Sequence, residues 1–168
     1  SSRVRRSVTA AMLLATVALA AAPKKHDTTK LRELAADATL LDTVKKQNAD
    51  VVSEVAVQVI DGRWGIGKES VLARRSITGP CAERMRAFLT ANAGYTEAFV
   101  LDAQGAIVCA NARTANYWYG EQPRWQRAMK GAPFSGDDGI VSVPMIDGES
   151  VIGVVTARIR TAAARPPR

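Results

Sequence analysis

Two long apolar runs near the C-terminus, joined by Asp147-Gly148, restrict the fold of this chain more than any other feature. The runs cover residues 140–146 and 151–159. Asp-Gly between two apolar runs is one of the strongest short signals for a β-hairpin turn. Pro144 interrupts the first run, and because proline donates no backbone hydrogen bond, we expect that strand at a sheet edge or with a bulge. The sequence therefore predicts an antiparallel hairpin at this end of the chain.

The first half of the chain has the periodicity of helices. Apolar residues recur there at steps of three and four positions, which places them on one face of a helix. The segments with this pattern cover residues 27–48, 52–61 and 79–94. The first segment carries the longest apolar stripe, formed by Leu31, Leu34, Ala38, Leu41 and Val44. The stripe of the second segment is formed by Val52, Val55 and Val59.

A second hairpin is predicted between these helices and the C-terminal hairpin. Residues 98–101 and 106–109 are short apolar runs, and Asp102-Ala103-Gln104-Gly105 between them has the composition of a turn. The chain thus places its helices first and its two hairpins after them. That order predicts an α+β domain in which helices pack on one side of a mostly antiparallel sheet.

The N-terminal segment has the composition of a secretory signal peptide. Three arginines within the first six residues precede an apolar run over residues 8–22. The run is shorter than the roughly 20 apolar residues that span a membrane, and it ends in small residues suited to cleavage. We expect residues 1–22 to be removed on export, residues 23–161 to form one domain and residues 162–168 to be a disordered tail. The alternative is an uncleaved membrane anchor at the N-terminus.

The charge and the cysteines are consistent with an exported protein. Removal of the three N-terminal arginines lowers the formal net charge from +7 to +4, which is too mild to indicate nucleic-acid binding. We expect the protein to be periplasmic or secreted. Cys81 and Cys109 remain after cleavage, and an oxidising compartment permits a disulfide between them. The alternative is that both are small buried hydrophobic residues.

The chain concentrates its aromatic residues between the two predicted hairpins. Four of the nine aromatic residues fall within residues 117–125, namely Tyr117, Trp118, Tyr119 and Trp125. Large amphipathic side chains on a loop held by a sheet are typical of a binding site. In an extended chain the two tyrosines share one face and Trp118 lies on the other. The alternative is that the tryptophans close the core beneath the loop.

Three motifs suggest a catalytic or metal site, but each lacks a required feature. Residues 62–68 nearly match the phosphate-binding G-x-x-x-x-G-K-[ST] loop, but Glu69 stands where the loop needs a hydroxyl. We expect a glycine-rich connection there, with Trp64 packed on the core. His26 is the only histidine, which excludes a Ser-His-Asp triad or a His-rich metal cluster within the domain. Asp137-Asp138 could be a fragment of a calcium-binding loop, but two acidic residues between glycines are more typical of a solvated turn. We therefore expect no metal, no cofactor and no enzymatic activity.

The second half contains a series of short segments in a characteristic order: strand, glycine turn, strand, Tyr-Trp loop, Trp helix and two further strands. The segments are Tyr95–Asp102, Gly105, Asn116-Tyr117-Trp118, Trp125-Gln126, Val143-Pro144, Asp147-Gly148 and Val151–Val155. In this order they resemble a single Cache domain, the PAS-like extracellular sensor module of bacteria, over residues 31–159. The resemblance implies a long N-terminal helix and further helices packed on an antiparallel sheet of about five strands. It also implies a small-molecule pocket between that sheet and the loop and short helix after the second strand.

The resemblance places the candidate ligand-binding residues in and near the aromatic segment: Asp102, Arg113, Tyr117, Trp118, Tyr119, Arg124, Trp125 and Arg158. Members that bind amino acids have an arginine two positions before a Trp-Tyr pair and an aspartate late in the last strand. Trp125 matches that tryptophan, but Arg124 stands one position early and Gln126 replaces the tyrosine. Arg158 stands where the aspartate is expected. A small carboxylate is therefore favoured over an α-amino acid, since arginine binds planar anions with two parallel hydrogen bonds.

Each candidate also has an ordinary structural role. Arg113, Arg124 and Arg158 could be solvated charges, and Asp102 could cap the hairpin turn. The favoured function is an exported, non-catalytic sensor domain that binds a small polar, anionic molecule. Its partner would be a membrane sensor kinase or a chemoreceptor, and the stripe of the first helix could form a homodimer or pack on its own sheet. The alternative is a periplasmic structural or protein-interaction module whose pocket is filled.

Overall fold

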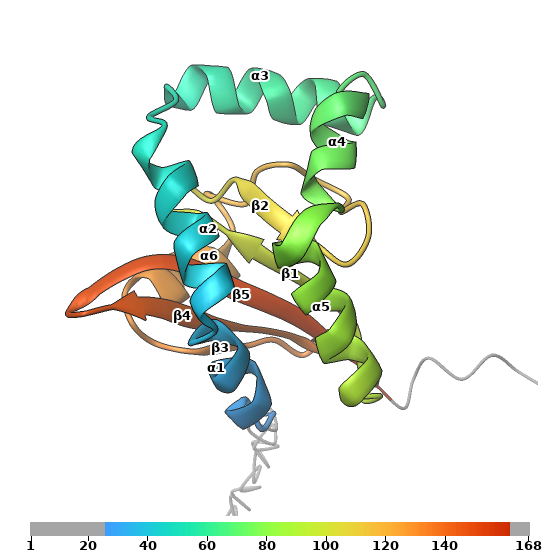
Figure 1. The fold of residues 1–168 in the computed structure, drawn as a ribbon, viewed down its shortest axis with the longest axis vertical. Coiled ribbons are helices and arrows are strands. Elements are labelled where there is room, and N and C mark those ends of the chain that lie inside the picture. Colours follow the sequence, from blue (N-terminus) through green and yellow to red (C-terminus); the bar gives the residue numbers. More distant parts are fainter. Residues whose placement is uncertain (1–25, 162–168) are drawn as a thin grey trace, which may run out of the picture.

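The computed structural model of the protein describes residues 26–161. The expected signal peptide and the expected C-terminal tail lie outside the described residues, as does the start of the expected domain. The described part contains six helices and five strands (Figure 1). In chain order they are α1 (Thr29–Ala35), α2 (Ala38–Ala49), α3 (Glu54–Gly65), α4 (Ser70–Ser76), α5 (Gly79–Ala91), β1 (Tyr95–Leu101), β2 (Ile107–Ala110), α6 (Pro123–Met129), β3 (Phe134–Ser135), β4 (Ile140–Asp147) and β5 (Ser150–Ile159).

The five strands form one antiparallel sheet in the order β2-β1-β5-β4-β3. Both predicted hairpins are present, β1 with β2 and β4 with β5, and Gly148 in the second turn has a φ of +62°. Pro144 lies beyond the two residues of β4 that pair with β3, so it has a strand on one side only, and a bulge follows between Met145 and Ile146. These features confirm the predicted α+β, PAS-like class.

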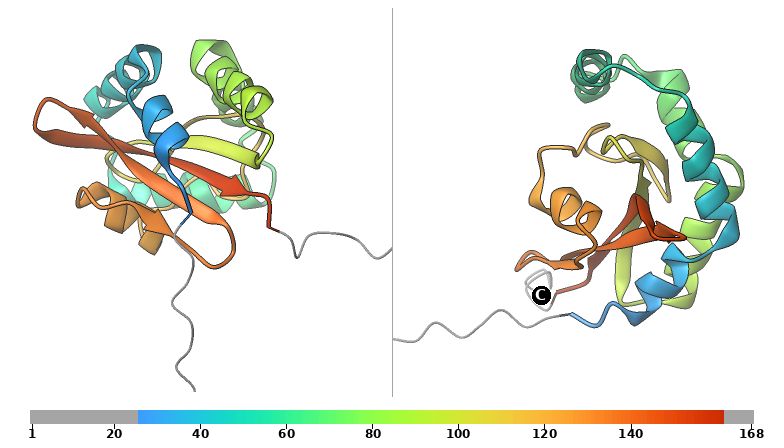
Figure 2. Two further views of the ribbon diagram at one scale, coloured as in Figure 1. Left: turned by 90° about the horizontal axis from the view of Figure 1, so that it is seen from below. Right: turned by 90° about the vertical axis from the view of Figure 1, so that its left-hand side faces the viewer.

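Helices cover both faces of the sheet, and not one face as the sequence pattern suggested (Figure 2). Helices α1, α2 and α5 pack on one face. Helix α6 and the loop before it form a second apolar layer on the other face. Helix α3 lies across the end of the domain beyond β2, and α4 leads from it to α5 (Figure 1). A separate end layer therefore stands above the β1–β2 turn.

The helical segment expected over residues 27–48 is divided into α1 and α2 at Ala36 and Asp37. Asp37 has extended backbone, and its carboxylate accepts hydrogen bonds from the N–H groups of Thr39 and Leu40 at 2.8 and 3.2 Å. This capping geometry begins a new helix and ends the previous one. The predicted apolar stripe faces the sheet only in part. Leu31 and Val44 are fully buried, Leu34 and Leu41 are partly buried against the core, and Ala38 is exposed. Leu40, which was not in the predicted stripe, is fully buried.

The second predicted helix differs from α3 in its extent and in its buried face. It begins at Glu54 and continues through the glycine-rich segment to Gly65, where a loose connection was expected. Trp64 is buried on the core as predicted. The predicted stripe is wrong as a core face, because Val52, Val55 and Val59 are 37, 70 and 57% exposed, respectively. Val57 and Trp64 face the interior instead.

Cys81 and Cys109 are joined by a disulfide. Their Cα atoms lie 6.0 Å apart, and the bond connects the first turn of α5 to β2. Of the two alternatives that the sequence left open, the structure therefore contains the covalent one.

Among the described residues, no helix is long and apolar enough to cross a membrane.

Candidate functional site

The aromatic segment runs beside the turn between β1 and β2. The N–H of Ile107 donates to the carbonyl of Tyr117 at 2.9 Å, and the N–H of Tyr119 donates to the carbonyl of Gly105 at 2.8 Å. These bonds flank an isolated antiparallel bridge between Ala106 and Trp118. The segment therefore continues the sheet beyond β2 as a short extended stretch.

Both tryptophans of the segment fasten it to the same turn. The indole Nε1 of Trp118 donates to the carbonyl of Gln104 at 2.7 Å. The indole Nε1 of Trp125, at the start of α6, donates to the carbonyl of Asp102 at 3.0 Å. Both side chains are partly buried against the neighbouring core. Their hydrogen-bonding groups are thus occupied by the protein itself.

The two tyrosines point into the protein, as the alternation of an extended chain predicts. Tyr119 is 4% exposed, and its ring lies 5.1 Å from that of Phe99 on β1. Burial raises the pKa of Tyr119 above its ordinary value. Beside these rings, the hydroxyls of Ser142 and Thr156 bond to each other at 2.8 Å and are fully buried. Side chains therefore fill much of the space between the aromatic segment and the sheet.

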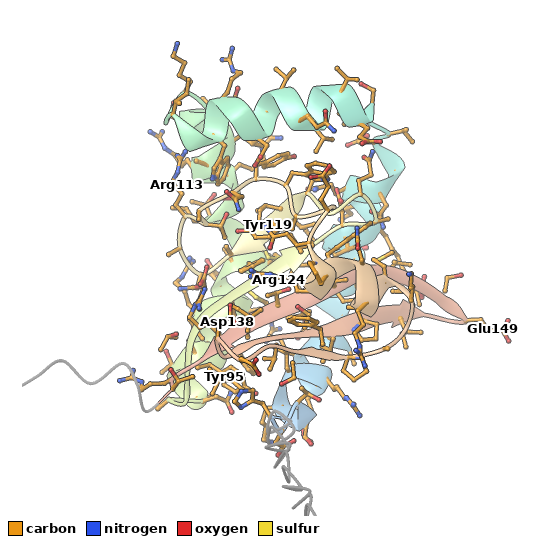
Figure 3. The ribbon with its side chains drawn as sticks, turned by 180° about the vertical axis from the view of Figure 1, so that it is seen from behind. Tyr95, Arg113, Tyr119, Arg124, Asp138 and Glu149 are labelled. Atoms are coloured by element: carbon orange, nitrogen blue, oxygen red, sulfur yellow. A yellow bond between two sulfur atoms is a disulfide. The ribbon has the colours of Figure 1, made fainter. Side chains whose placement is uncertain are left out.

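The three candidate arginines have contacts within the protein. Arg113 donates to the carbonyl of Trp64 at 2.7 Å, and its guanidinium lies 4.5 Å from the ring centre of that residue. The guanidinium of Arg124 lies 5.7 Å from the ring centre of Tyr119 (Figure 3). Arg158 on β5 forms an ion pair with Glu97 at 3.4 Å. These contacts account for the positions of all three side chains without a ligand.

A hollow of about 160 Å³ lies beside Tyr117, the first residue of the aromatic segment. Its walls come from the end of α2, from α3 and α4, and from the β1–β2 hairpin. Two of the predicted site residues, Asp102 and Tyr117, line it. The other polar lining residues are Gln47, Asp50, Arg75, Ser76 and Gln104. The hollow thus combines chain segments that are far apart in the sequence.

The hydroxyl of Tyr117 is the most informative group in this wall. It makes no hydrogen bond with any described residue, although Tyr117 is only 8% exposed. No fully buried polar side-chain atom in the described part of the chain lacks a partner, so this hydroxyl keeps some contact with solvent, and Tyr117 is one of the residues that line the hollow. Burial raises the pKa of Tyr117, and the negative charges of Asp102 and Glu69 add to that shift. A hydroxyl that faces a partly enclosed space is available to a ligand.

Two charged side chains of the wall also have no partner among the residues described. Arg75 is at the end of α4, and Asp50 directly follows α2. Neither forms an ion pair or a side-chain hydrogen bond with the described residues. Both are largely exposed, so water reaches the hollow from their side. The entrance therefore carries one positive and one negative charge.

Asp102 has a structural role in the floor of the hollow. One of its carboxylate oxygens accepts hydrogen bonds from the N–H groups of Gln104 and Ala106, at 2.8 and 3.0 Å. The other oxygen accepts from the side-chain amide of Gln47 at 2.8 Å. Because these bonds fix the turn and hold α2 against it, Asp102 defines the shape of the hollow.

Helix α3 is the roof. Its Val57 lines the hollow, and its Asp61 carboxylate accepts the N–H groups of Tyr117 and Trp118 at 2.8 and 3.0 Å. The indole of Trp64 donates to the carbonyl of Thr114 at 2.9 Å. The described contacts of α3 are therefore mainly with the aromatic loop, and they connect the roof of the hollow to the backbone of Tyr117.

Sequence reasoning did not identify Arg75, Asp50 or Gln47. Arg75 is in α4, a helix for which no prediction was made, and the other two are near the end of α2. The only available signal was an arginine pair, Arg74-Arg75, in a segment without strong apolar periodicity. Nothing in that segment indicates contact with a hairpin turn some 27 residues later in the chain.

Comparisons with known proteins give no family. No known protein family matches the chain, and no curated protein matches it. Among solved structures, the chain is similar to the extracellular domain of the putative histidine kinase rpHK1S-Z16, with 19% identity and a TM-score of 0.39. The match covers 77% of this chain and 54% of that structure, so the chain spans about half the length of its neighbour. At this level the likeness supports no conclusion about function.

Proposed function

We propose that this protein is an exported, non-catalytic sensor domain that binds a small polar molecule in the hollow beneath α3. The observation that supports the proposal most is the hydroxyl of Tyr117, a residue that lines the hollow, because this hydroxyl makes no hydrogen bond with any described residue. Polar groups in a binding pocket are commonly free to bond to the ligand and fix its orientation. The resemblance of the sequence to Cache domains, which are extracellular sensor modules, supports the same function.

The volume of the hollow favours a small metabolite as the ligand. About 160 Å³ is several times the roughly 30 Å³ that a water molecule occupies in the liquid. It is well below the roughly 300–1,000 Å³ of sites for drug-sized molecules. The ligand would therefore have a compact skeleton, such as that of a short-chain acid.

The charges at the entrance suggest the chemistry of the ligand. The guanidinium of Arg75 suits a carboxylate, which it can bind with two parallel hydrogen bonds. Asp50 and Tyr117 can accept a hydrogen bond from a hydroxyl or an amine of the same molecule. We therefore propose a small carboxylate with a second polar group. The anionic end is held by Arg75, and Arg124 and Arg158 retain their contacts with Tyr119 and Glu97.

A thermal-shift screen tests this proposal. Small hydroxy acids, simple carboxylates, amino acids, amines and sugars are added to the purified protein, and the melting temperature is measured. A compound that binds only the folded state must raise it. We expect a hydroxy or amino carboxylate to produce the largest rise, and Arg75→Gln to remove most of it.

The adjacent Arg74 provides a matched control. Arg74 is an exposed residue of the same helix turn, and it is not part of the wall of the hollow. Arg74→Gln removes the same charge and should leave the ligand-induced rise unchanged. Equal losses in the two variants would show a general charge effect and would count against the site.

The signalling partner that we propose is a membrane sensor kinase or a chemoreceptor. The support is the resemblance to Cache domains, which serve such proteins outside the membrane. Cross-linking in membranes with and without the active ligand tests this step. We expect a cross-link to a membrane signalling protein that changes with ligand, and an unchanged pattern would remove the partner from the proposal.

One observation favours a second candidate, a structural or interaction module that binds no ligand. Tyr119, Phe99 and the Ser142–Thr156 pair fill the space where a Cache pocket is expected. This candidate predicts that no class of compound raises the melting temperature. It also predicts that Tyr117→Phe has no functional consequence, since the hollow would hold only water.

A further inference from the structure

Helix α3 has apolar residues on two opposite faces. The inner face carries Val57 and Trp64, which are 2% exposed. On the opposite face, Val55, Val59 and Ile66 follow at helical spacing and are 70, 57 and 67% exposed. An apolar stripe on a helix is normally buried against a neighbouring element. The outer face of α3 therefore lacks a cover within the described part of the chain.

The surroundings of α3 leave this face accessible. Figure 1 shows α3 at one end of the molecule, and both ends of the described chain lie at the opposite end. Val51 before the helix and Val71 after it are also exposed, at 89 and 76%. Clusters of exposed apolar residues on soluble domains are typical of interaction sites.

We propose that two copies of this chain associate through the outer faces of their α3 helices, packed antiparallel about a two-fold axis. This proposal does not depend on the ligand site. In such a pair Val59 of one copy lies opposite Gly62 of the other, and Val55 lies opposite Ile66. No atom lies within 4 Å of the position that a Cβ would take at Gly62, so a gap is available for the opposing valine. A side chain that enters a gap on the facing helix is the usual packing of paired helices.

The charges along α3 select the antiparallel arrangement. Glu54 begins the helix, and Lys68 lies just beyond its end. Antiparallel packing brings the end of one helix that carries Glu54 toward the end of the other that carries Lys68, whereas parallel packing would bring ends of like charge together. Because a two-fold axis repeats every contact, one such complementary pair gives two across the interface.

The first helical stripe cannot form this contact. Of that stripe, Leu31 and Val44 are fully buried against the sheet of their own domain, and Leu34 and Leu41 are partly buried against the same core. Most of the homodimer surface expected from the sequence is therefore already covered. The α3 pair is short, since 12 residues of helix extend about 18 Å. Standard interfaces bury about 800 Å² on each partner. Because one short helix per copy covers less area than that, we expect a dissociation constant on the order of micromolar or weaker.

Analytical ultracentrifugation over a range of concentrations tests the dimer. The native protein should show a monomer–dimer equilibrium. Val59→Lys should raise the dissociation constant at least about tenfold, because it places a buried charge at the centre of the interface. Ile146→Lys is the matched control, since Ile146 is 53% exposed at the tip of the β4–β5 hairpin, away from α3. A native protein that stays monomeric up to about 1 mM overturns the proposal.

A charge exchange tests the antiparallel register. Glu54→Lys and Lys68→Glu should each weaken the dimer, and the double variant E54K/K68E should restore it. Far-ultraviolet circular dichroism confirms that each variant remains folded. Binding of the native protein, but not of Val59→Lys, to vesicles of anionic phospholipid without any dimer would assign this face to a membrane and contradict the proposal.

Discussion

At the scale of single residues, Gly105 shows why the aromatic segment can lie so close to the β1–β2 turn. Its φ is +86°, a backbone conformation that disfavours side chains. A Cβ at this position would also lie 2.6 Å from the backbone N of Gly120. Both requirements are met by glycine alone, so this residue allows the close contact between the turn and the aromatic segment.

We expect Gly105→Ala to lower the free energy of unfolding by more than about 2 kcal/mol, since strain of roughly 1–3 kcal/mol adds to the clash. Urea denaturation measures the change. Gly67→Ala is the control, because Gly67 has a similar φ of +76° with no atom near its Cβ position. Gly67→Ala should therefore lower the free energy of unfolding by the backbone strain alone. An equal loss of stability in the two variants would contradict the close contact between Gly105 and Gly120.

The buried tyrosines predict a loss of stability in alkali. The folded-state pKa values of Tyr117 and Tyr119 are raised by burial, whereas the unfolded chain titrates at about 10. Above that pH the unfolded state loses protons first, so the free energy of unfolding falls as pH rises. The double variant Y117F/Y119F should show a shallower fall in urea denaturation between about pH 9 and 11. An unchanged slope would contradict the raised pKa values of these two tyrosines.

At the scale of elements, the strands could be predicted from the sequence better than the helices. Asp147-Gly148 and the apolar runs on either side of it determine the β4–β5 hairpin locally, and Pro144 indicates the open edge of β4. The two faces of α3 are a different case. Because Val55 and Val59 are as apolar as the residues of the inner face, periodicity detects a helix but cannot tell which face is buried.

The break between α1 and α2 depends on the cap formed by Asp37. We expect Asp37→Ala to lower the free energy of unfolding by about 1 kcal/mol, the usual cost of losing such a cap. Thermal denaturation measures it. Asp37 also forms a partly exposed ion pair with Arg84, in which Oδ2 of Asp37 lies 3.6 Å from Nε of Arg84. Arg84→Gln removes this ion pair but keeps the cap, so it is the control. If Arg84→Gln costs as much as Asp37→Ala, the cap is not the source of the stability.

At the scale of the whole molecule, the disulfide connects the helical half to the sheet. It closes a loop of 28 residues between Cys81 and Cys109. On the chain-entropy estimate, its loss should lower the free energy of unfolding by roughly 3.5 kcal/mol. Cys81→Ser with Cys109→Ser, compared with the native protein in urea, measures the difference. A change close to zero would show that the bond does not restrict the unfolded chain.

The candidate site could be predicted only in part, because it is assembled from distant segments. Tyr117 and Asp102 were detectable, since one belongs to an aromatic cluster and the other to a turn. Arg75 and Asp50 reach the same hollow from helices whose sequence gives no sign of that contact. Their convergence depends on how α3 and α4 cross the end of the sheet, which is a property of the tertiary structure.

The central claim is that a ligand binds the Tyr117 hydroxyl beneath α3, and a calorimetric titration of native and Tyr117→Phe protein tests it most directly. The titrant is the carboxylate that raises the native melting temperature most. The substitution keeps the ring and removes only the hydroxyl, so the unliganded melting temperature should stay unchanged. We predict that the dissociation constant rises roughly threefold to tenfold, as expected for one lost hydrogen bond. Equal affinity in the two proteins would contradict the claim.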